Sequence, residues 1–323
     1  MTVNDKKGLE NGDVGIDKGI KDSILLSSAK NVGKGLYSMI GKGNNGDLIP
    51  GVIENFLAKN SNIDTETRKR LLLFAEESIY WDSYAKNVSI KYRRTYYESP
   101  TYQSMVRAID QFINPKRDEV WGDLGCGALQ MSKLILKKTK DIGKIYAMDV
   151  FLAAARGELL NIERPQAVEL VYGSLTDSLP FPNNFFNGII VNCAFTFIIE
   201  HEGETGETGL KKLFQEIYRV LKPGGVLVWS SPCKDANNIL GVIPSVGYAL
   251  NPYLWFKLKT FLPIGIVMIL KHTKTLLKKG KSGIYPILSR ARYEEISSSV
   301  GFVNSEWEYT FGHQGEANRV YKS

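Results

Sequence analysis

The spacing of hydrophobic positions alternates between two periods from residue 119 onward. Short apolar runs predict the strands EVWGDLG, KIYAMDV, VELVYGS, NGIIVNCAF and GGVLVWSSP. Between them, apolar positions at helical spacing predict the helices QMSKLILKKTK, LAAARGELLNI and GLKKLFQEIYRVLK. Strands separated by helices of about 10–15 residues are typical of βαβ units, so this pattern predicts a parallel sheet with both faces covered.

The two ends of the chain predict further elements around this sheet. Downstream, ARYEEISSSVGF predicts a helix, and NSEWEYT and NRVYKS predict two terminal strands. Upstream, one helix is expected from Asp64 through RKRLLLFAEESIYWDSYAK, and a second, TYQSMVRAIDQFI, after Pro100. Residues 1–60 contain ten glycines and little periodicity, so we expect disorder over 1–22 and loose helix over 23–60.

The chain is accordingly divided into four parts. They are a flexible or loosely helical N-terminal extension (1–60), a helical lid (61–118), a core (119–236 and 287–323) and a basic, apolar cap insertion (237–286). The charged N-terminus has no apolar core, so we expect no signal peptide. The longest uncharged apolar run, FLPIGIVMIL, has ten residues, whereas a membrane-spanning helix needs about 20, so no transmembrane segment is expected.

Cysteine and histidine are scarce. The chain has three of each, and the cysteines show no paired spacing. This favours a reducing compartment and argues against a disulfide framework, a zinc site or a histidine-built metal centre. We therefore expect a cytoplasmic protein without a bound metal.

The stretch VWGDLGCGALQMS predicts a strand end, a glycine turn and the start of a helix. Gly125 and Gly127 match the first two glycines of the dinucleotide pattern G-x-G-x-x-G, but Gln130 occupies the third position. This counts against NAD or FAD, whose diphosphate rests on the helix N-terminus. Asp123 ahead of the glycines suits a ligand with an ammonium group and no phosphate, such as S-adenosylmethionine. Asp149 ends the next strand, 22 residues beyond Gly127, about the offset at which an acid binds ribose hydroxyls.

Two further stretches, GSLTDSLPFPNNFFNGIIVN and LKKLFQEIYRVLKPGGVLVWSSP, follow the turn in the order typical of class I S-adenosylmethionine-dependent methyltransferases. Over residues 80–323 the sequence resembles that superfamily. LPFPNNFF and RVLKPGG look most like the branch of ubiquinone/menaquinone C-methyltransferases and sterol and tocopherol methyltransferases. The resemblance implies an α/β fold with a Rossmann-like seven-stranded sheet, mostly parallel with an antiparallel last strand. Helices would cover both faces, with an N-terminal helical extension and a helical cap inserted after strand 5.

The resemblance also implies where S-adenosylmethionine would lie, over the carboxyl ends of the first strands. The matching positions are Asp123, Gly125, Cys126 and Gly127 at the methionine part, Asp149 and Val150 at the ribose, Ser174 and Leu175 at the adenine, Asn192 near the reacting methyl, and Tyr80 and Tyr84 in an aromatic lid. Asn192 is also a catalytic candidate. His201, in the loop IEHEGETGETG after the fourth strand, is the candidate general base.

Three positions depart from the family pattern. Leu129 stands where a third glycine is usual, Ser174 replaces an acid beside the adenine, and Asn187 replaces a frequent aspartate. Together they keep open a weak or non-catalytic cofactor site.

Simpler structural interpretations also stand beside these roles. Asp123 and Asp149 would then only cap helices. Tyr80 and Tyr84 would pack together at i and i+4 of one helix, and His201 would be solvated.

The basic charge of the chain comes from one segment. The net charge is +7, and the interval between Asp235 and Glu294 has no acidic residue but nine lysines and arginines. Residues 253–281 mix aromatic and aliphatic side chains with lysines. This composition fits helices lying on an anionic membrane surface, where each basic residue contributes about 1 kcal/mol. A cap with solvated lysines is the alternative, whereas the apolar content of the segment is too high for a nucleic-acid groove.

These observations favour S-adenosylmethionine-dependent methyl transfer to a lipophilic or small aromatic/isoprenoid acceptor, by a protein peripheral on the membrane. In the resembled branch the region of the insertion walls the substrate pocket, and an apolar wall suits such an acceptor. The end of the fourth strand, Asn192 to Phe195, lacks the Asn/Asp-Pro-Pro-Tyr motif of amide and adenine N-methyltransferases, which disfavours nucleic acid. Two alternatives stay open: methylation of a soluble metabolite, and a non-catalytic S-adenosylmethionine-binding protein.

Overall fold

The computed structural model describes residues 97–150, 152–258 and 262–323, together with the isolated residues 57, 58, 65, 68 and 72. The predicted N-terminal extension and the first predicted helix therefore lie almost wholly outside the described residues. Tyr80 and Tyr84, the proposed aromatic lid, lie outside them as well.

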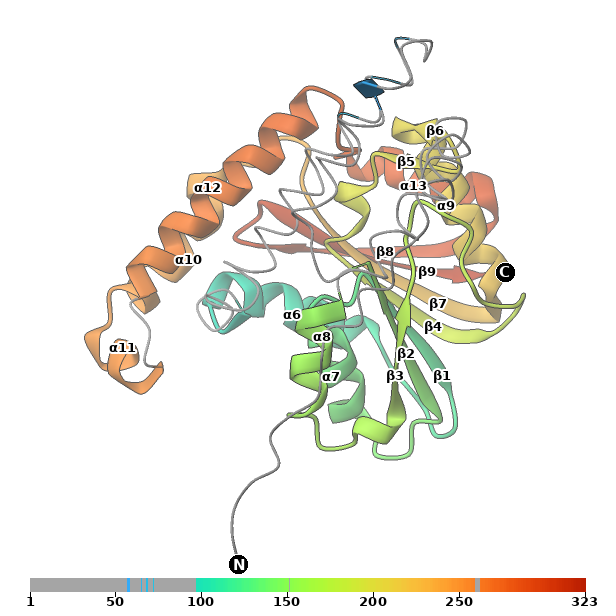
Figure 1. The fold of residues 1–323 in the computed structure, drawn as a ribbon, viewed down its shortest axis with the longest axis horizontal. Coiled ribbons are helices and arrows are strands. Elements are labelled where there is room, and N and C mark those ends of the chain that lie inside the picture. The colour runs from blue at the N-terminus through green and yellow to red at the C-terminus, as the bar shows by residue number, and fades with distance from the viewer. Residues whose placement is uncertain are drawn as a thin grey trace, which may run out of the picture.

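The core is a seven-stranded sheet in the order β3-β2-β1-β4-β7-β9-β8 (Figure 1). Its strands are β1 (Val120–Leu124), β2 (Lys144–Asp149), β3 (Val168–Tyr172), β4 (Phe186–Asn192), β7 (Leu221–Pro232), β8 (Phe302–Thr310) and β9 (Gly315–Lys322). Neighbours among β3, β2, β1, β4 and β7 are parallel, whereas β9 runs antiparallel to both β7 and β8. The predicted parallel sheet with an antiparallel last strand is confirmed.

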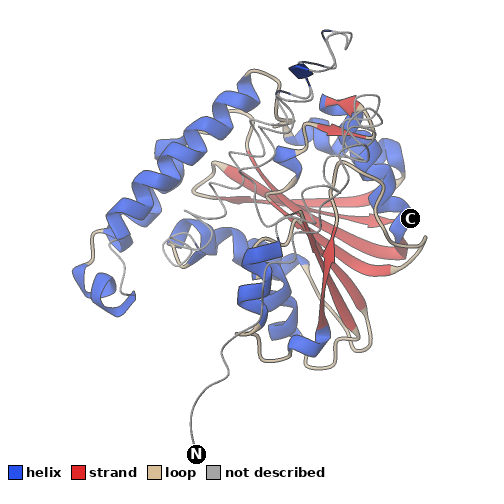
Figure 2. Cartoon of the chain, in the orientation of Figure 1, coloured by secondary structure: helices blue, strands red, loops and turns tan. Residues whose placement is uncertain are grey.

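Helices cover both faces of the sheet (Figure 2). The helices are α6 (Pro100–Phe112), α7 (Gln130–Lys138) and α8 (Leu152–Leu159) on one face, and α9 (Gly206–Val220) and α13 (Arg290–Val300) on the other. One buried apolar cluster joins α6, α7 and α8 to strand residues such as Trp121 and Ile145. The other joins α9 and α13 to Leu124, Ile189 and Trp229. Because strand residues alternate between the two faces, the near-continuous apolar runs supply both clusters.

Three helices follow β7 and precede α13, as the predicted cap insertion requires. They are α10 (Asn238–Ala249), α11 (Pro252–Leu258) and α12 (Leu262–Lys281). In Figure 1, α12 is a long helix that runs beside the sheet, and α11 lies at its far end. Helix α10 packs against both α6 and α12, which fixes the cap to the core. Within the described residues, no helix combines the length and the apolar composition that crossing a membrane requires.

Short elements fill the connections. They are the 3-10 turns η2 (Pro165–Ala167) and η3 (Phe195–Phe197), and a small hairpin of β5 (Glu200–His201) and β6 (Glu204–Thr205). The sequence analysis expected a loop at 199–209 and did not predict this hairpin. Strands of two residues carry no periodicity that a sequence pattern could reveal.

Candidate active site

A cavity of about 320 Å³ lies where the parallel strands end, between the sheet, α6 and the cap. Ligands of open α/β sheets bind at this edge. Most of the sequence-predicted site residues line the cavity, namely Asp123, Gly125, Cys126, Gly127, Asp149, Val150, Ser174, Leu175 and Asn192. The structure therefore brings together every described residue of the predicted cofactor site.

The glycine turn is bonded to the end of β2. The N–H groups of Gly125 and Cys126 donate to the carbonyl of Met148 at 2.8 and 3.1 Å, and the N–H of Gly127 donates to Asp149 Oδ2 at 2.9 Å. Gly125 has φ +75°, and a Cβ there would lie 2.6 Å from the Cβ of Ala194. Only glycine meets both conditions, so the backbone can approach a ligand closely at this point.

Leu129 stands where the family pattern usually has a third glycine. It has φ 59° and ψ 30° and precedes α7. Its side chain is fully buried. This left-handed conformation favours glycine, so the leucine is held there against its backbone preference by burial.

Asp123 has a structural role in the described fold. Its Oδ2 accepts hydrogen bonds from the N–H of Ser132 at 2.9 Å and from Ser132 Oγ at 2.6 Å, both in the first turn of α7. Burial raises the pKa of Asp123 to about 6, against the lowering effect of those two hydrogen bonds. In the fold, the Asp123 carboxylate therefore caps the start of α7. Contact between Asp123 and a ligand ammonium group stays a prediction.

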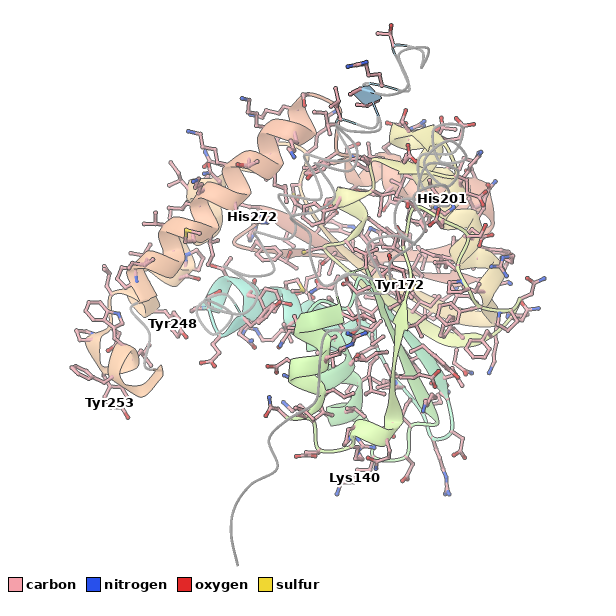
Figure 3. The ribbon with its side chains drawn as sticks, viewed as in Figure 1. Lys140, Tyr172, His201, Tyr248, Tyr253 and His272 are labelled. Atoms are coloured by element: carbon pink, nitrogen blue, oxygen red, sulfur yellow. The ribbon has the colours of Figure 1, made fainter. Side chains whose placement is uncertain are left out.

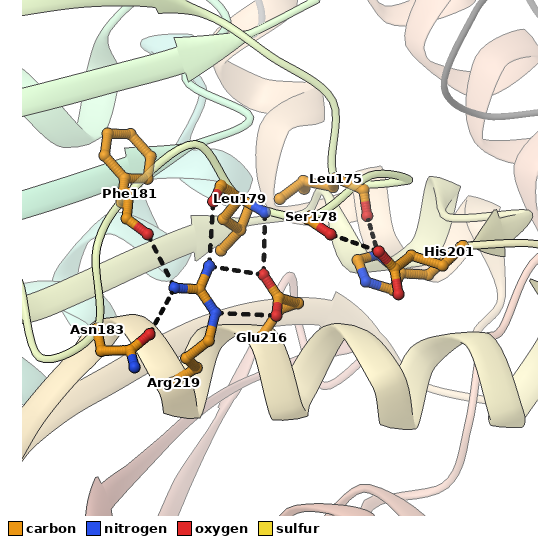
Figure 4. A network of polar contacts seen from close by, with 9 residues as sticks. Leu175, Ser178, Leu179, Phe181, Asn183, His201, Glu216 and Arg219 are labelled. Carbon is orange, nitrogen blue, oxygen red and sulfur yellow. Dashed lines mark hydrogen bonds and ion pairs between the residues drawn. The ribbon is translucent and has the colours of Figure 1, made fainter.

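The loop that carries Ser174 and Leu175 is held from α9. Ser174 Oγ lies 2.7 Å from Thr176 Oγ1 and accepts from the N–H of Thr176 at 3.1 Å. Further along, Arg219 donates to the carbonyls of Phe181 and Leu179 at 2.9 and 3.1 Å (Figure 4).

Arg219 also donates to both carboxylate oxygens of Glu216, at 2.8 and 3.0 Å. This pairing lowers the pKa of Glu216, which stays ionised and accepts the N–H of Leu179 at 3.0 Å. The ion pair thus fixes the path of the loop predicted to contact adenine.

Asn192 at the end of β4 joins the sheet to α6. Its Nδ2 donates to Tyr102 Oη at 3.0 Å, and its Oδ1 accepts from Ser230 Oγ at 2.6 Å. The next residue, Cys193, has φ 55° and donates its N–H to Ser230 Oγ at 3.0 Å. Burial raises the pKa of the Cys193 thiol to about 11, so the thiol is protonated at neutral pH. Asn192 is therefore an oriented amide on the cavity wall.

His201, the predicted general base, does not lie on the cavity wall. His201 is buried in β5, and its Nδ1 lies 2.7 Å from the carbonyl of Leu175 (Figure 4). Burial also lowers the pKa of this imidazole. The expectation that His201 faces the substrate is wrong, because the buried ring contacts the Leu175 carbonyl and is not among the residues that line the cavity.

The sequence analysis missed the residues that close the cavity on the cap side. They are Val242 and Ser245 of α10 and Ile266, Ile269, His272, Thr273, Leu276 and Leu277 of α12. The α12 positions recur at intervals of three and four, which is the spacing of one helix face. That spacing was visible in the sequence, but which face turns toward the cavity depends on how the cap packs on α6.

The charges around the cavity suit S-adenosylmethionine. Among the described lining residues, the carboxylates of Asp123 and Asp149 are present, and no lysine or arginine is. A diphosphate would lack a cationic partner there, whereas a ligand with sulfonium and ammonium groups is attracted. At Gly125 a ligand can approach the backbone closely, so this turn provides a surface for the adenosine and methionine parts of the cofactor.

Comparisons with known proteins agree with this site. Residues 122–229 match the family model described as "Methyltransferase domain". A demethylmenaquinone methyltransferase of Symbiobacterium thermophilum is 25% identical over 197 residues, covering 58% of this chain and 69% of the relative. A ubiquinone/menaquinone biosynthesis C-methyltransferase, UbiE, of Neisseria meningitidis is 32% identical over 135 residues, covering 41% of this chain and half of the relative.

Among solved structures, the N-methyltransferase NodS of Bradyrhizobium japonicum, in complex with S-adenosyl-L-homocysteine, covers 75% of this chain and 95% of its own, with a TM-score of 0.48 and 11% identity. At that score the likeness adds nothing to the sequence matches. The family match spans the glycine turn and the strands that bear both acids. The chain therefore contains a class I S-adenosylmethionine-dependent methyltransferase domain, with S-adenosylmethionine as its cofactor.

Proposed function

We propose that this protein transfers the methyl group of S-adenosylmethionine to a lipophilic acceptor at an anionic membrane surface. The observation that carries the proposal is the two-sided cap. Its inner face walls the cavity with apolar side chains, and its outer face exposes apolar and basic side chains.

The acceptor side of the cavity is built for an apolar molecule. Ile266, Ile269 and Leu276 of α12 line the same cavity as Val242 of α10 and Ile198. Pockets with largely apolar walls and a few polar groups bind ligands of matching character. The carboxylates among the described lining residues, Asp123 and Asp149, lie on the cofactor side, so a charged metabolite would find no ionic partner on this wall.

The outer face of the cap is apolar at one end. Helix α10 buries Val242, Ser245 and Ala249 against the core, yet its opposite face is apolar too. The exposed large apolar residues of the cap are Ile239, Leu240, Ile243, Val246, Leu250, Tyr253, Phe256, Ile264 and Val267. Figure 3 shows Tyr253 at the far end of the cap, on α11. A helix that is apolar all round needs a partner on both sides, and exposed apolar residues gathered on the helices of one insertion are what a membrane or protein contact would require.

The outer stripe of α12 changes from apolar to basic along its length. Ile264 and Val267 are followed at helical spacing by the exposed side chains of Lys271, Lys274 and Lys278. No acidic residue occurs between Asp235 and Glu294 to neutralise these lysines. Apolar residues beside lysines are what an interfacial helix needs on anionic headgroups. We therefore include α10 in the membrane surface proposed for residues 253–281.

The names of the relatives support the same acceptor class. One is called a demethylmenaquinone methyltransferase and the other a ubiquinone/menaquinone biosynthesis C-methyltransferase. This chain covers 69% of the first and half of the second. A quinone-type or other isoprenoid acceptor is therefore the first candidate within the lipophilic class.

The main catalytic task of this chain is to align the acceptor with the methyl group of the cofactor. When bound, the cofactor supplies an activated methyl group for in-line displacement. The turn at Gly125 and the loop at Ser174 hold one side of the cavity, and the cap excludes water from the other. Asn192, oriented by Tyr102 and Ser230, offers an amide to whichever reactant lies beside it.

Transfer of labelled methyl to lipid tests the activity. The protein is incubated with methyl-labelled S-adenosylmethionine and a total lipid extract, and the label is followed into lipid and aqueous fractions. Label in a lipid supports the proposal. Label only in a water-soluble product contradicts the lipophilic acceptor, and binding without transfer contradicts the activity.

Liposome sedimentation tests the membrane surface separately. Ile243→Glu combined with Phe256→Glu should abolish binding to vesicles of phosphatidylglycerol and phosphatidylcholine, while the affinity for S-adenosylmethionine stays the same. Leu160→Glu is the matched control, because Leu160 is 87% exposed and lies outside the cap at the end of α8. Unchanged vesicle binding in the cap variant would overturn the membrane surface.

A further inference from the structure

His272 is the one polar, titratable side chain that α12 places on the cavity wall. It lies between Ile269 and Leu276 along that face, and both of these also line the cavity. Figure 3 labels His272 on the side of α12 that faces the sheet. Among the described lining residues it is the only imidazole, since His201 and His313 do not line the cavity.

The other titratable groups around the cavity belong to its other walls. They are Tyr97 and Tyr102 on the α6 side, Asp123, Cys126 and Asp149 at the cofactor turn, and Cys193 after β4. Lys279 of α12 is not a lining residue, although its charge acts on His272. Asp123 and Asp149 hold backbone groups of α7 and of the turn. Burial raises the pKa of both cysteine thiols, so they remain protonated. None of these groups is placed like His272 on the acceptor side.

The imidazole of His272 is in the right protonation state to take up a proton. Burial lowers its pKa to about 4, with a smaller contribution from the charge of Lys279. At neutral pH the ring is therefore uncharged, and one nitrogen carries a lone pair. A neutral imidazole in an apolar wall can accept a hydrogen bond from an acceptor hydroxyl or amine.

We propose that His272 is the general base of the methyl transfer, acting on an acceptor whose nucleophile carries a proton. The inference rests on the proposed function. The nucleophile's electron pair forms the bond to the methyl carbon, and the carbon–sulfur bond breaks with its electron pair going to sulfur. The nucleophile's proton passes to the unprotonated ring nitrogen of His272 and then to water.

The cavity keeps the same charge through this step, which is why a weakly basic imidazole suffices. The sulfonium charge is present before transfer and is replaced afterwards by the charge on His272, while the ammonium and carboxylate groups of the cofactor do not change. A second cation in the apolar cavity would be costly, and the step never creates one. The nucleophile's proton also becomes more acidic as its electron pair is drawn into the new bond, so the imidazole need not be a strong base.

Substitution of His272 tests the role. His272→Gln keeps a polar side chain of similar reach but cannot take up a proton, and kcat should fall by about 10²–10⁴-fold with the acceptor that the wild type methylates. The dissociation constant of S-adenosylmethionine should stay unchanged. In His272→Ala, added imidazole should restore part of the lost rate, which a purely structural role would not produce. His313→Gln, outside the cavity, is the matched control and should keep the wild-type rate.

A spectroscopic readout does not depend on turnover. In protein labelled at histidine, His272 is assigned by its absence in His272→Gln. Its ring should protonate at a lower pH with S-adenosylmethionine bound than with S-adenosylhomocysteine, because only the former carries the positive charge of a sulfonium into the same cavity. Identical titration with the two ligands would overturn the proposal.

The two proposals fail in different ways. A wild-type protein that labels no lipid overturns the proposed function, and the base with it. A wild-type protein that labels a lipid, together with a His272→Gln variant of unchanged kcat, overturns the base alone. Loss of kcat in His272→Gln with rescue of His272→Ala by imidazole supports both.

Discussion

Ser245 Oγ lies 2.6 Å from Thr101 Oγ1 and accepts the N–H of Thr101 at 3.1 Å, so one hydroxyl of α10 holds the cap to the first turn of α6. Both side chains are buried and both line the cavity. The N–H of Thr101 is one of the amides at a helix start that have no partner within their own helix. Ser245 therefore completes α6 and closes the cavity with the same atom.

Removing this hydroxyl should loosen the cap. Ser245→Ala leaves two buried polar groups of Thr101 unsatisfied and should lower the free energy of unfolding by about 1–3 kcal/mol. Thr101→Val keeps the N–H bond to Ser245 and should cost less, about 1 kcal/mol. Denaturant unfolding gives the order, and amide exchange should show faster opening of α10 in Ser245→Ala. Equal costs in the two variants would mean that the N–H bond contributes nothing.

Replacement of Asp123 by asparagine should separate stability from cofactor binding. Burial raises the pKa of Asp123 to about 6 from 3.8, so the ionised carboxylate at pH 7 costs up to about 3 kcal/mol of stability. Asp123→Asn keeps an oxygen for Ser132 without the charge. The variant should therefore unfold at higher denaturant than the wild type at pH 7. If Asp123 contacts the ligand ammonium group, S-adenosylmethionine affinity should drop by on the order of tenfold.

The stability difference between Asp123→Asn and the wild type should change with pH in a definite direction. A carboxyl whose pKa is raised in the fold binds its proton more tightly there than in the unfolded chain, so its cost disappears as the pH falls through 6 toward 4. The stability advantage of Asp123→Asn should therefore shrink over that window. An advantage that is constant from pH 7 to pH 4, measured by urea unfolding, would contradict the raised pKa.

The fold was largely predictable because parallel strands that are buried on both faces are continuous apolar runs. The predicted strands and the helices between them lie where the structure has β1–β4, β7 and α7–α9. Helix α10 was not predicted, since Gly241, Pro244 and Gly247 all lower helix propensity in its interior. Packing against α6 and α12 stabilises it nonetheless, and that contact is not visible in a local pattern.

The candidate site was predictable only on its cofactor side. The strand ends place Asp123 and Asp149 at one edge of the sheet whatever the rest of the chain does. The acceptor side depends on tertiary packing: His272 is one of several polar residues on α12, and only the docking of the cap selects it. For His201 the pattern indicated a loop, whereas the structure has a hairpin of two-residue strands in which the His201 side chain is buried.

His201 offers a direct test of that correction. His201→Asn keeps a nitrogen near the position of Nδ1, which can still donate to the carbonyl of Leu175. Methyl transfer should be unchanged within error, whereas removal of a true general base would lower kcat by at least about a hundredfold. A loss of that size in a folded His201→Asn protein would restore His201 as the base.

The two glycines of the cofactor turn should respond differently to alanine. At Gly125 a Cβ would lie 2.6 Å from Ala194 Cβ in addition to the unfavourable φ of +75°. Gly125→Ala should therefore lower stability by about 2–4 kcal/mol, the sum of strain and overpacking. At Gly127 a Cβ would meet only Tyr97 Oη, 4.0 Å away, so the strain at φ +47° remains and costs about 1–2 kcal/mol.

For the affinity toward S-adenosylmethionine, the larger effect should come from Gly127→Ala rather than from Gly125→Ala. The methyl group of Gly127→Ala would occupy open space on the cavity wall, where the cofactor must approach the backbone. Its main effect should be a weaker affinity for S-adenosylmethionine in a protein that is still folded, measured by calorimetry. Gly125→Ala should instead appear first as a lower midpoint of thermal unfolding. If Gly127→Ala bound S-adenosylmethionine as tightly as the wild type, the cofactor would not lie against this turn.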